Sequence, residues 1–239
     1  MHRLDKRIRQ KNKSILVLWC VLVFGSLTCA KVTAEEYVYP AEWQPHQAIW
    51  VGFRTGSEGL AHETVLQEMF KALAPQVRVK VVIEDESLIP EGMTYFSALG
   101  LAPSNFEIVQ LNPADFWFRD PGPLFLRNRD QGLAIADFFY TNYAAINPEL
   151  ASPRAVAYGK IDRAIAKKLH LPLVETTMVI EGGAFEVNGN GTILLTEATA
   201  DRNPHLSRFQ IEAEICRTLG QKKVIWLRHG LAQDPLGLA

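Results

Sequence analysis

Residues 181–199 read "EGGAFEVNGNGTILLTEAT", and this order of residue types is the strongest indication of fold in the chain. Glu181 is followed by two glycines, an apolar run, the turn sequence Asn-Gly-Asn-Gly and a second apolar run. Two apolar runs joined by such a turn predict a β-hairpin. A helix follows, because Ser207 with Gln210 three residues later forms a capping box and Gly220 is a helix stop. Residues 222–227 then predict a strand.

The same succession occurs once before, after the stretch "NPADFWFRDPGPLFL" at residues 112–126. Asp120 precedes a glycine, a hairpin pattern at 123–140, a helical pattern at 160–170 and an apolar run at 173–180. Each acid therefore opens a ββαβ unit. This repetition predicts an α/β fold made of repeated units rather than an ordinary doubly wound sheet.

The chain upstream of the two units shows further strand and helix patterns and no low-complexity linker. We expect strands at 48–53, 77–84 and 106–111, and a helix at 57–75 that ends at Pro75. About 205 residues follow the N-terminal segment described next, which is enough for one domain with a substantial core. The sequence therefore predicts a single domain.

The N-terminal segment has the three parts of a secretory signal. Residues 1–13 are rich in Lys and Arg, residues 14–27 are apolar, and Val32 and Ala34 have the spacing of a signal-peptidase site. The apolar run is short for a membrane span, which needs about 20 residues. We expect a signal peptide at 1–34, a mature domain at 35–239 and export to the periplasm or the extracellular space. An uncleaved membrane anchor is the alternative.

Charge and cysteine content narrow the function classes. Residues 1–34 hold seven basic residues and one acid, which leaves 18 basic and 25 acidic residues in the mature chain. An acidic chain argues against a nucleic-acid partner and is compatible with a cationic substrate.

Cys216 is the last of the three cysteines and lies in a helical apolar pattern with Phe209, Ile211, Ile215 and Leu219. We expect no internal disulfide, and a core cysteine rather than a reactive thiol.

Asp120 and Glu181 would converge if the repeat is real, and two convergent carboxylates suit three tasks. The mature histidines show no close ligand pairing, so a metal is not expected, and no organic cofactor is indicated. Two acids alone also fit sugar hydrolysis. Guanidinium binding fits best, because Trp117 stands three residues before Asp120 and an indole can stack on a planar cation. The structural alternative is that Trp117 belongs to the core and Glu181 caps a turn.

Five stretches, in order, resemble the agmatine deiminase and bacterial-type peptidylarginine deiminase family. They are "PAEWQPHQAIWVGF", "WFRDPGP", "EGGAFEVNGNGTILLTEAT", "RNPHLSRFQIE" and "KKVIWLRHGL". The resemblance runs from about residue 39 to the end and implies a pentein-type β/α propeller of repeated ββαβ units. This chain would form an incomplete ring of such units.

The resemblance also implies an activity and roles for single residues. In the family a cysteine attacks a guanidinium carbon, ammonia leaves, and water releases a citrulline-type ureido product. By motif match, Asp120 would be a catalytic acid that holds the guanidinium, Trp117 would line the pocket, and Glu181 would lie at or next to the substrate. Arg119 would brace its loop by pairing with a neighbouring acid. The substrate would be agmatine or peptidyl-arginine, and the export signal favours the latter because agmatine is usually processed inside cells.

The sequence departs from the family near its end. The family continues with a Gly-His-x-Asp segment and a C-terminal nucleophilic cysteine, and neither has a match before Ala239. Cys216 lies in the helix after the second hairpin, and His229 reads as a surface residue at a strand end. We therefore expect a C-terminally truncated chain that is inactive by the family mechanism. The alternative is a guanidinium-binding module that was never catalytic.

Overall fold

The computed structural model describes residues 37–230, except for 54–56, 115–116 and 142–151, and for residues 57–63 it describes the backbone alone. The expected signal peptide at 1–34 lies outside the described residues. Within the described part, no helix combines the length and the apolar character that crossing a membrane requires.

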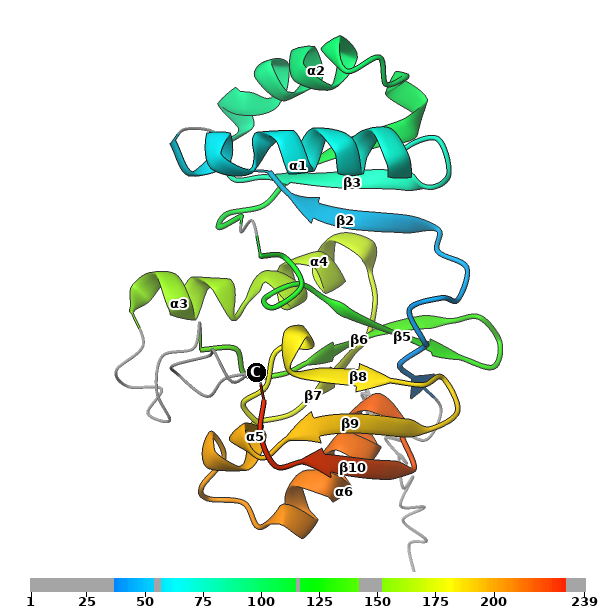
Figure 1. The fold of residues 1–239 in the computed structure, drawn as a ribbon, viewed down its shortest axis with the longest axis vertical. Coiled ribbons are helices and arrows are strands. Elements are labelled where there is room, and N and C mark those ends of the chain that lie inside the picture. Colours follow the sequence, from blue (N-terminus) through cyan, green and yellow to red (C-terminus); the bar gives the residue numbers. More distant parts are fainter. Residues whose placement is uncertain (1–36, 54–56, 115–116, 142–151, 231–239) are drawn as a thin grey trace, which may run out of the picture. The chain divides into compact units, whose positions relative to one another are not determined.

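The first sheet is parallel and carries its helices on one face (Figure 1). Its strands pair in the order β2-β3-β4, and β3 pairs in parallel with both neighbours. Apolar side chains of the strands, such as Val79 and Val81, are fully buried in one cluster with Phe70 of the first helix and Phe96 of the second. The elements are β2 (Ala48–Gly52), α1 (Ser57–Leu73), β3 (Arg78–Ile83), α2 (Ile89–Ala98) and β4 (Phe106–Gln110).

The second sheet contains the first of the two expected ββαβ units. Strands β5 and β6 form the antiparallel hairpin, β7 lies parallel to β6, and the short β1 pairs with the outer edge of β5. The connection from β6 to β7 contains α3 and α4. The elements are β1 (Tyr37–Val38), β5 (Leu124–Asn128), β6 (Leu133–Asp137), α3 (Pro153–Tyr158), α4 (Ile161–Leu169) and β7 (Leu173–Glu175).

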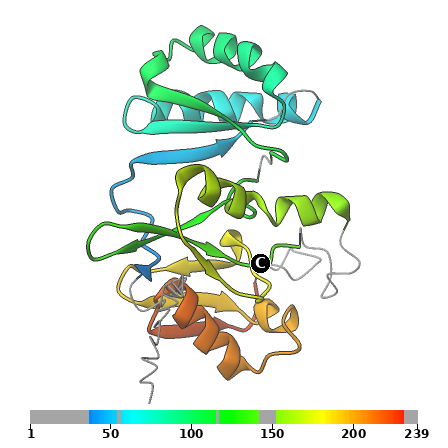
Figure 2. The ribbon, with the colours of Figure 1, turned by 180° about the vertical axis from the view of Figure 1, so that it is seen from behind.

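The third sheet repeats this order and confirms the expected unit. Strands β8 and β9 are antiparallel, and β10 returns parallel to β9 after α6 (Figure 2). The capping box of Ser207 and Gln210 starts α6, and Gly220 ends it in a left-handed conformation with φ +64. The elements are β8 (Phe185–Val187), β9 (Thr192–Thr196), α5 (Ala198–Asp201), α6 (Arg208–Leu219) and β10 (Lys223–Leu227).

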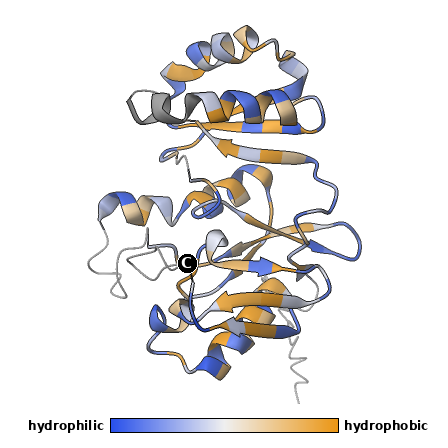
Figure 3. Cartoon of the chain, in the orientation of Figure 1, coloured by the Kyte–Doolittle hydropathy of each residue, from blue (hydrophilic) through white to orange (hydrophobic). Residues whose placement is uncertain are grey.

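The core side of α6 differs from the sequence expectation at two positions. Ile211, Ile215 and Leu219 are fully buried, whereas the side chain of Phe209 is 79% exposed and Cys216 is half-buried. A helix turns by about 100° per residue, so Phe209 lies about 200° from Ile211 and faces away from the core. Cys216 lies next to the buried row rather than in it. Apolar residues (orange in Figure 3) otherwise follow the strands and the covered helix faces.

Strand β7 ends at Glu175 and is shorter than the expected strand at 173–180, and a side chain rather than a strand partners the backbone at Val179. The fully buried Asn203 accepts a hydrogen bond from Val179 N at 2.8 Å and donates one to Val179 O at 2.8 Å. Its amide nitrogen also donates to Thr199 O at 2.8 Å. The backbone polar groups of Val179 are therefore satisfied by one asparagine, and the chain can leave the sheet before Glu181.

We expect Asn203→Ala to destabilise the protein by about 3 kcal/mol, because it leaves buried backbone groups of Val179 and Thr199 without partners. Urea unfolding followed by circular dichroism measures the loss. The matched control is Asn190→Ala in the exposed β8–β9 turn, which should stay within about 0.5 kcal/mol of the parent. Equal stability of the two variants would show that Asn203 does not hold this segment.

Candidate functional site

The two acidic motifs meet at the starts of β5 and β8. Asp120 Oδ1 accepts a hydrogen bond from the backbone N–H of Gly183 at 3.1 Å. From the same loop, Arg119 Nε donates to the carbonyl oxygen of Gly182 at 2.9 Å. The loop before the first hairpin is thus bonded directly to the residues that open the second. The structure brings Asp120 and Glu181 together, as the repeated unit predicted.

The two glycines after Glu181 permit this close approach. A Cβ atom on Gly182 would lie 2.4 Å from the carbonyl oxygen of Arg119, and one on Gly183 would lie 2.3 Å from Asp120 Oδ1. Both distances are far below van der Waals contact, so a larger residue would push the loops apart. The Glu-Gly-Gly sequence therefore has a steric reason: it lets one motif rest on the other.

Glu181 is not an exposed acid but half of a buried ion pair. Its side chain is 3% exposed, and both carboxylate oxygens contact Arg202: Oε1 lies 2.5 Å from Nη1 and Oε2 lies 2.5 Å from Nη2. Burial raises the pKa of Glu181, and the Arg202 guanidinium opposes that rise. The nearby carboxylate of Asp120, which lines the same small cavity, raises the pKa of Glu181 further. An internal guanidinium is thus already bound to Glu181.

A small cavity lies between the motifs. Asp120, Glu181 and Asp162 line it together with Tyr140, and the surrounding wall is largely apolar and backbone. Its volume is about 10 Å3, which is room for about one water molecule. Asp120 is half-buried, whereas Glu181 and Asp162 are buried. Asp120 is therefore the carboxylate of this cavity that solvent reaches most readily.

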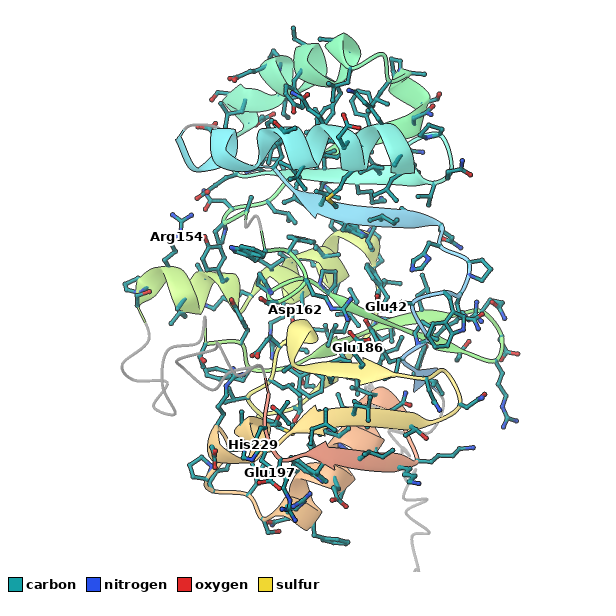
Figure 4. All side chains as sticks on the ribbon, in the orientation of Figure 1. Glu42, Arg154, Asp162, Glu186, Glu197 and His229 are labelled. Atoms are coloured by element: carbon teal, nitrogen blue, oxygen red, sulfur yellow. The ribbon has the colours of Figure 1, made fainter. Side chains whose placement is uncertain are left out.

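Asp137 and Asp162 form a second acidic feature beside the cavity. Asp137 ends β6, Asp162 lies in the first turn of α4 (labelled in Figure 4), and their carboxyl groups are hydrogen-bonded to each other. Burial, with the charge of Asp137, raises the pKa of Asp162 to about 8, and burial also raises the pKa of Asp137. Arg163 is ion-paired with Asp137 and lies 2.9 Å from Glu175 Oε1. The two buried acids therefore share one proton at neutral pH and carry about one charge.

Arg119 braces the Asp120 loop, as expected from the sequence. Its guanidinium forms an ion pair with Glu42 and lies 3.8 Å from Glu186 Oε1. Figure 4 labels these two glutamates, which come from the segment after β1 and from β8. Three parts of the chain are therefore tied together immediately beside Asp120.

Trp117 occupies a different environment from the two acids. Its carbonyl oxygen accepts a hydrogen bond from Asp120 N at 3.0 Å, which closes a tight turn, but its indole is 64% exposed and does not line the small cavity. Its role as a pocket wall remains a prediction. Trp117 and Asp120 share this turn, and an exposed indole is a group that can cover the face of a planar cation.

The described residues contain no second set of catalytic groups at the cavity. Cys216 lines a separate groove near Arg217 and Gln221, and burial raises the pKa of its thiol, which disfavours a reactive thiolate. His229 is exposed just after β10. Among the described residues, no cluster of three or more His, Cys, Asp or Glu side chains is suited to hold a metal ion.

Sequence reasoning missed four residues that shape the site: Asp137, Asp162, Arg202 and Asn203. Arg202 and Asn203 belong to "RNPHLSRFQIE", so the stretch was noticed but not its contacts. The available sequence signal was that Arg202 and Asn203 stand side by side at the start of this stretch. Asp137 and Asp162 lie 25 positions apart in the sequence and carried no comparable signal.

The chain resembles known proteins along most of its length. The pattern of the family described as Porphyromonas-type peptidyl-arginine deiminase matches residues 38–236. An agmatine deiminase of Medicago truncatula is 29% identical over 218 residues, which are 84% of this chain and 56% of that protein. A putative agmatine deiminase of Streptomyces avermitilis is 32% identical over 204 residues, 84% of this chain and 58% of that protein. The chain thus spans somewhat more than half the length of these relatives.

Solved structures give the same result for the fold. The agmatine deiminase of Enterococcus faecalis superposes with a TM-score of 0.71 at 22% identity, over 86% of this chain and 57% of that one. A putative arginine deiminase from Porphyromonas gingivalis gives a TM-score of 0.63 at 26% identity, over 82% and 58% of the two chains. The described residues therefore have the pentein-type β/α propeller architecture of repeated ββαβ units.

We expect Arg202→Met to destabilise the protein by about 3–5 kcal/mol, because it leaves the buried Glu181 carboxylate without its partner. Urea unfolding measures the loss. The double variant Glu181→Leu/Arg202→Met should recover most of it, since two apolar side chains of similar size remove the unpaired charge. Additive losses in the double variant would contradict a direct ion pair.

We expect Asp162→Asn to flatten the pH dependence of stability. The pKa of Asp162 is about 8 in the folded protein and about 3.9 in an unfolded chain. The unfolded state therefore loses its proton first, and the stability present below pH ~4 is progressively lost as pH rises towards pH 8. Asparagine keeps a hydrogen-bond donor towards Asp137 but cannot ionise.

Thermal unfolding midpoints between pH 5 and pH 8 test this expectation. The parent midpoint should fall more steeply across this range than that of Asp162→Asn. The control variant, Asp130→Asn in the exposed β5–β6 turn, should follow the parent. Parallel curves for the parent and Asp162→Asn would rule out a proton shared by the two buried acids.

Proposed function

The chain belongs to the Porphyromonas-type peptidyl-arginine deiminase family, and from that premise we propose that it provides the guanidinium-binding part of an enzyme that hydrolyses a guanidino group. The products would be a ureido compound and ammonia. The observation that carries the proposal is the meeting of the Asp120 loop with the Glu-Gly-Gly motif around a cavity lined by acids.

The proposed binding group is the Asp120 carboxylate. The cavity of about 10 Å3 is too small for a guanidinium, so the substrate headgroup binds where Asp120 reaches solvent rather than between the buried acids. A carboxylate accepts two parallel N–H groups of a guanidinium, and such paired hydrogen bonds to a charged partner are strong. Trp117, in the same turn, supplies a flat surface for the cation.

Glu181 then acts as a positioning residue. Its two oxygens are already held by Arg202, so it fixes Gly182 and Gly183, whose backbone groups hold the Asp120 loop. Pre-arranged acceptors do not have to reorganise when a cation binds, and this favours tight and selective binding. In this proposal Asp120 binds the substrate, and Glu181 holds the Asp120 loop in place.

We propose peptidyl-arginine as the substrate, ahead of agmatine. The support is the secretory signal pattern of residues 1–34, since export places the protein with extracellular peptides rather than with the polyamine precursors of the cell. Asp120 is also half-buried rather than fully enclosed, so a side chain on a polypeptide can reach it from solvent.

For the polypeptide in hand, we propose guanidinium binding without turnover. Its one described cysteine has a raised pKa and lies in another groove, so no thiolate is placed next to Asp120. A non-catalytic guanidinium-binding module is the second candidate, and this placement of Cys216 is the observation that favours it.

Calorimetric titration of the 239-residue chain with agmatine and with N-acetyl-arginine amide tests the binding. Asp120→Asn should weaken both ligands about tenfold, because a charge-assisted hydrogen bond becomes a neutral one. Asp130→Asn, which removes an exposed acid from a different turn, is the matched control and should not change the affinity. Equal affinities for the parent and Asp120→Asn would contradict the assignment of Asp120.

An ammonia-release assay on the same samples tests the catalytic part separately. We expect no release above the uncatalysed background from either substrate. Sustained release by the parent would contradict the absence of turnover, and the Cys216→Ser variant would then show whether Cys216 is the nucleophile.

A further inference from the structure

We propose that a groove at the starting ends of β2, β3 and β4 binds a small aromatic carboxylate. The groove has a volume of about 520 Å3, within the range of about 300–1,000 Å3 that is common for small-molecule sites. It shares no lining residue with the acid-lined cavity at Asp120 and Glu181. The inference therefore stands or falls independently of the proposed function.

The floor of the groove is a partly uncovered edge of a hydrophobic core. Trp50 lies nearly parallel to Phe125, with ring centres 6.2 Å apart, and is also stacked with Phe118 at 6.3 Å. Leu133, Leu169 and Leu171 complete the floor, and these three leucines, like Trp50 and Phe125, are half-buried. These ring contacts fix the indole, and the half-buried rings and leucines together offer a pre-formed apolar surface to a flat group.

The rim of the groove carries more positive than negative charge. Arg78 Nη2 and Lys80 Nζ lie 3.3 Å and 3.2 Å from the same oxygen of Glu107, the acid among the lining residues. Lys80 Nζ also lies 5.0 Å from the centre of the Trp50 ring, and its side chain is 18% exposed. Arg127 has no ion-pair partner within the described ranges. Arg78, Lys80 and Arg127 against Glu107 give the rim a net charge of +2.

This excess of positive charge is local and held against an apolar surface. The whole chain has a formal net charge of −1, so the rim does not simply reflect the composition. Arg78 and Lys80 share one carboxylate oxygen, so part of the positive charge on the rim is uncompensated, and like charges beside a partly desolvated floor repel more strongly than they would in bulk water. A bound anion would relieve that repulsion, and the planar guanidinium of Arg127 is suited to a carboxylate because it can donate two parallel N–H groups.

The apolar floor and the positively charged rim together indicate which class of ligand fits the groove. An inorganic anion would leave the aromatic floor uncovered, and a neutral aromatic compound would leave Arg127 without a counter-charge, because Glu107 pairs only with Arg78 and Lys80 among the described residues. A nucleic acid would need a basic surface much larger than three side chains. A flat ring that carries one carboxylate satisfies both parts of the groove at once.

Calorimetric titration of the 239-residue chain with three probes tests the proposal. The probes are 3-phenylpropionate, its neutral amide 3-phenylpropionamide, and acetate, which has the charge without the ring. We expect 3-phenylpropionate to bind about tenfold or more tightly than either other probe, because only it uses both the ring surface and the charge-assisted hydrogen bond.

Charge-removing variants locate the site. Arg127→Gln should weaken 3-phenylpropionate about tenfold and leave the amide unchanged, and Lys80→Met should weaken the acid in the same direction. Arg129→Gln is the matched control, since Arg129 lies two residues further along the β5–β6 hairpin and does not line the groove. Unchanged thermal unfolding midpoints would confirm that the variants are folded.

Four outcomes would overturn the proposal. They are the absence of saturable binding by 3-phenylpropionate, equal binding of the acid and the amide, equal effects of Arg127→Gln and Arg129→Gln, and a concentration-dependent dimer in sedimentation that Arg127→Gln dissociates. The last result would make the groove an interface between two copies of the chain.

Discussion

The buried ion pair between Glu181 and Arg202 is the interaction on which the rest of the site depends. A carboxylate in a low-dielectric interior is unfavourable unless a cation and hydrogen bonds compensate it. Arg202 does so with two contacts of 2.5 Å, and the adjacent Asn203 satisfies the backbone of Val179 two residues before the glutamate. Together they fix the segment that leaves β7 and starts β8. Gly182 and Gly183 are then in place to receive the loop that carries Asp120.

The acids around the cavity end in different charge states because their surroundings differ. Glu181 is compensated by Arg202, while Asp137 and Asp162 share a proton and have Arg163 beside them. Asp120 is the half-buried member that solvent reaches, and Arg119 beside it is paired with Glu42. Asp120 is thus the acid of this group that is nearest to solvent, whereas Glu181, Asp137 and Asp162 lie deeper and have arginine partners or a shared proton. Such an arrangement suits the capture of a cation at Asp120 better than chemistry between the buried acids.

Much of the fold could be predicted from sequence because its signals are local. The Asn-Gly turn, the capping box at Ser207 and the repeated ββαβ order define elements that the structure confirms. Phe209 is apolar but lies about 200° from Ile211 around the helix, so it does not belong to the buried row that the sequence pattern predicted. Strand β7 was predicted too long: it ends at Glu175, and the backbone of Val179 is bonded by Asn203, which comes 24 residues later in the sequence. The pairing of Asp120 with the Glu-Gly-Gly motif followed from the repeat, but the partners Arg202 and Asp162 are tertiary contacts with no periodic signal.

The most direct test of a guanidinium site at Asp120 is a crystal structure of the chain with agmatine bound. We expect the guanidinium within hydrogen-bonding distance of the Asp120 carboxylate, with one face against Trp117, and the contacts of Glu181 with Arg202 unchanged. Agmatine bound elsewhere would contradict this description. So would a guanidinium that displaces Arg202 from Glu181, since Glu181 would then be the binding acid and Asp120 its support.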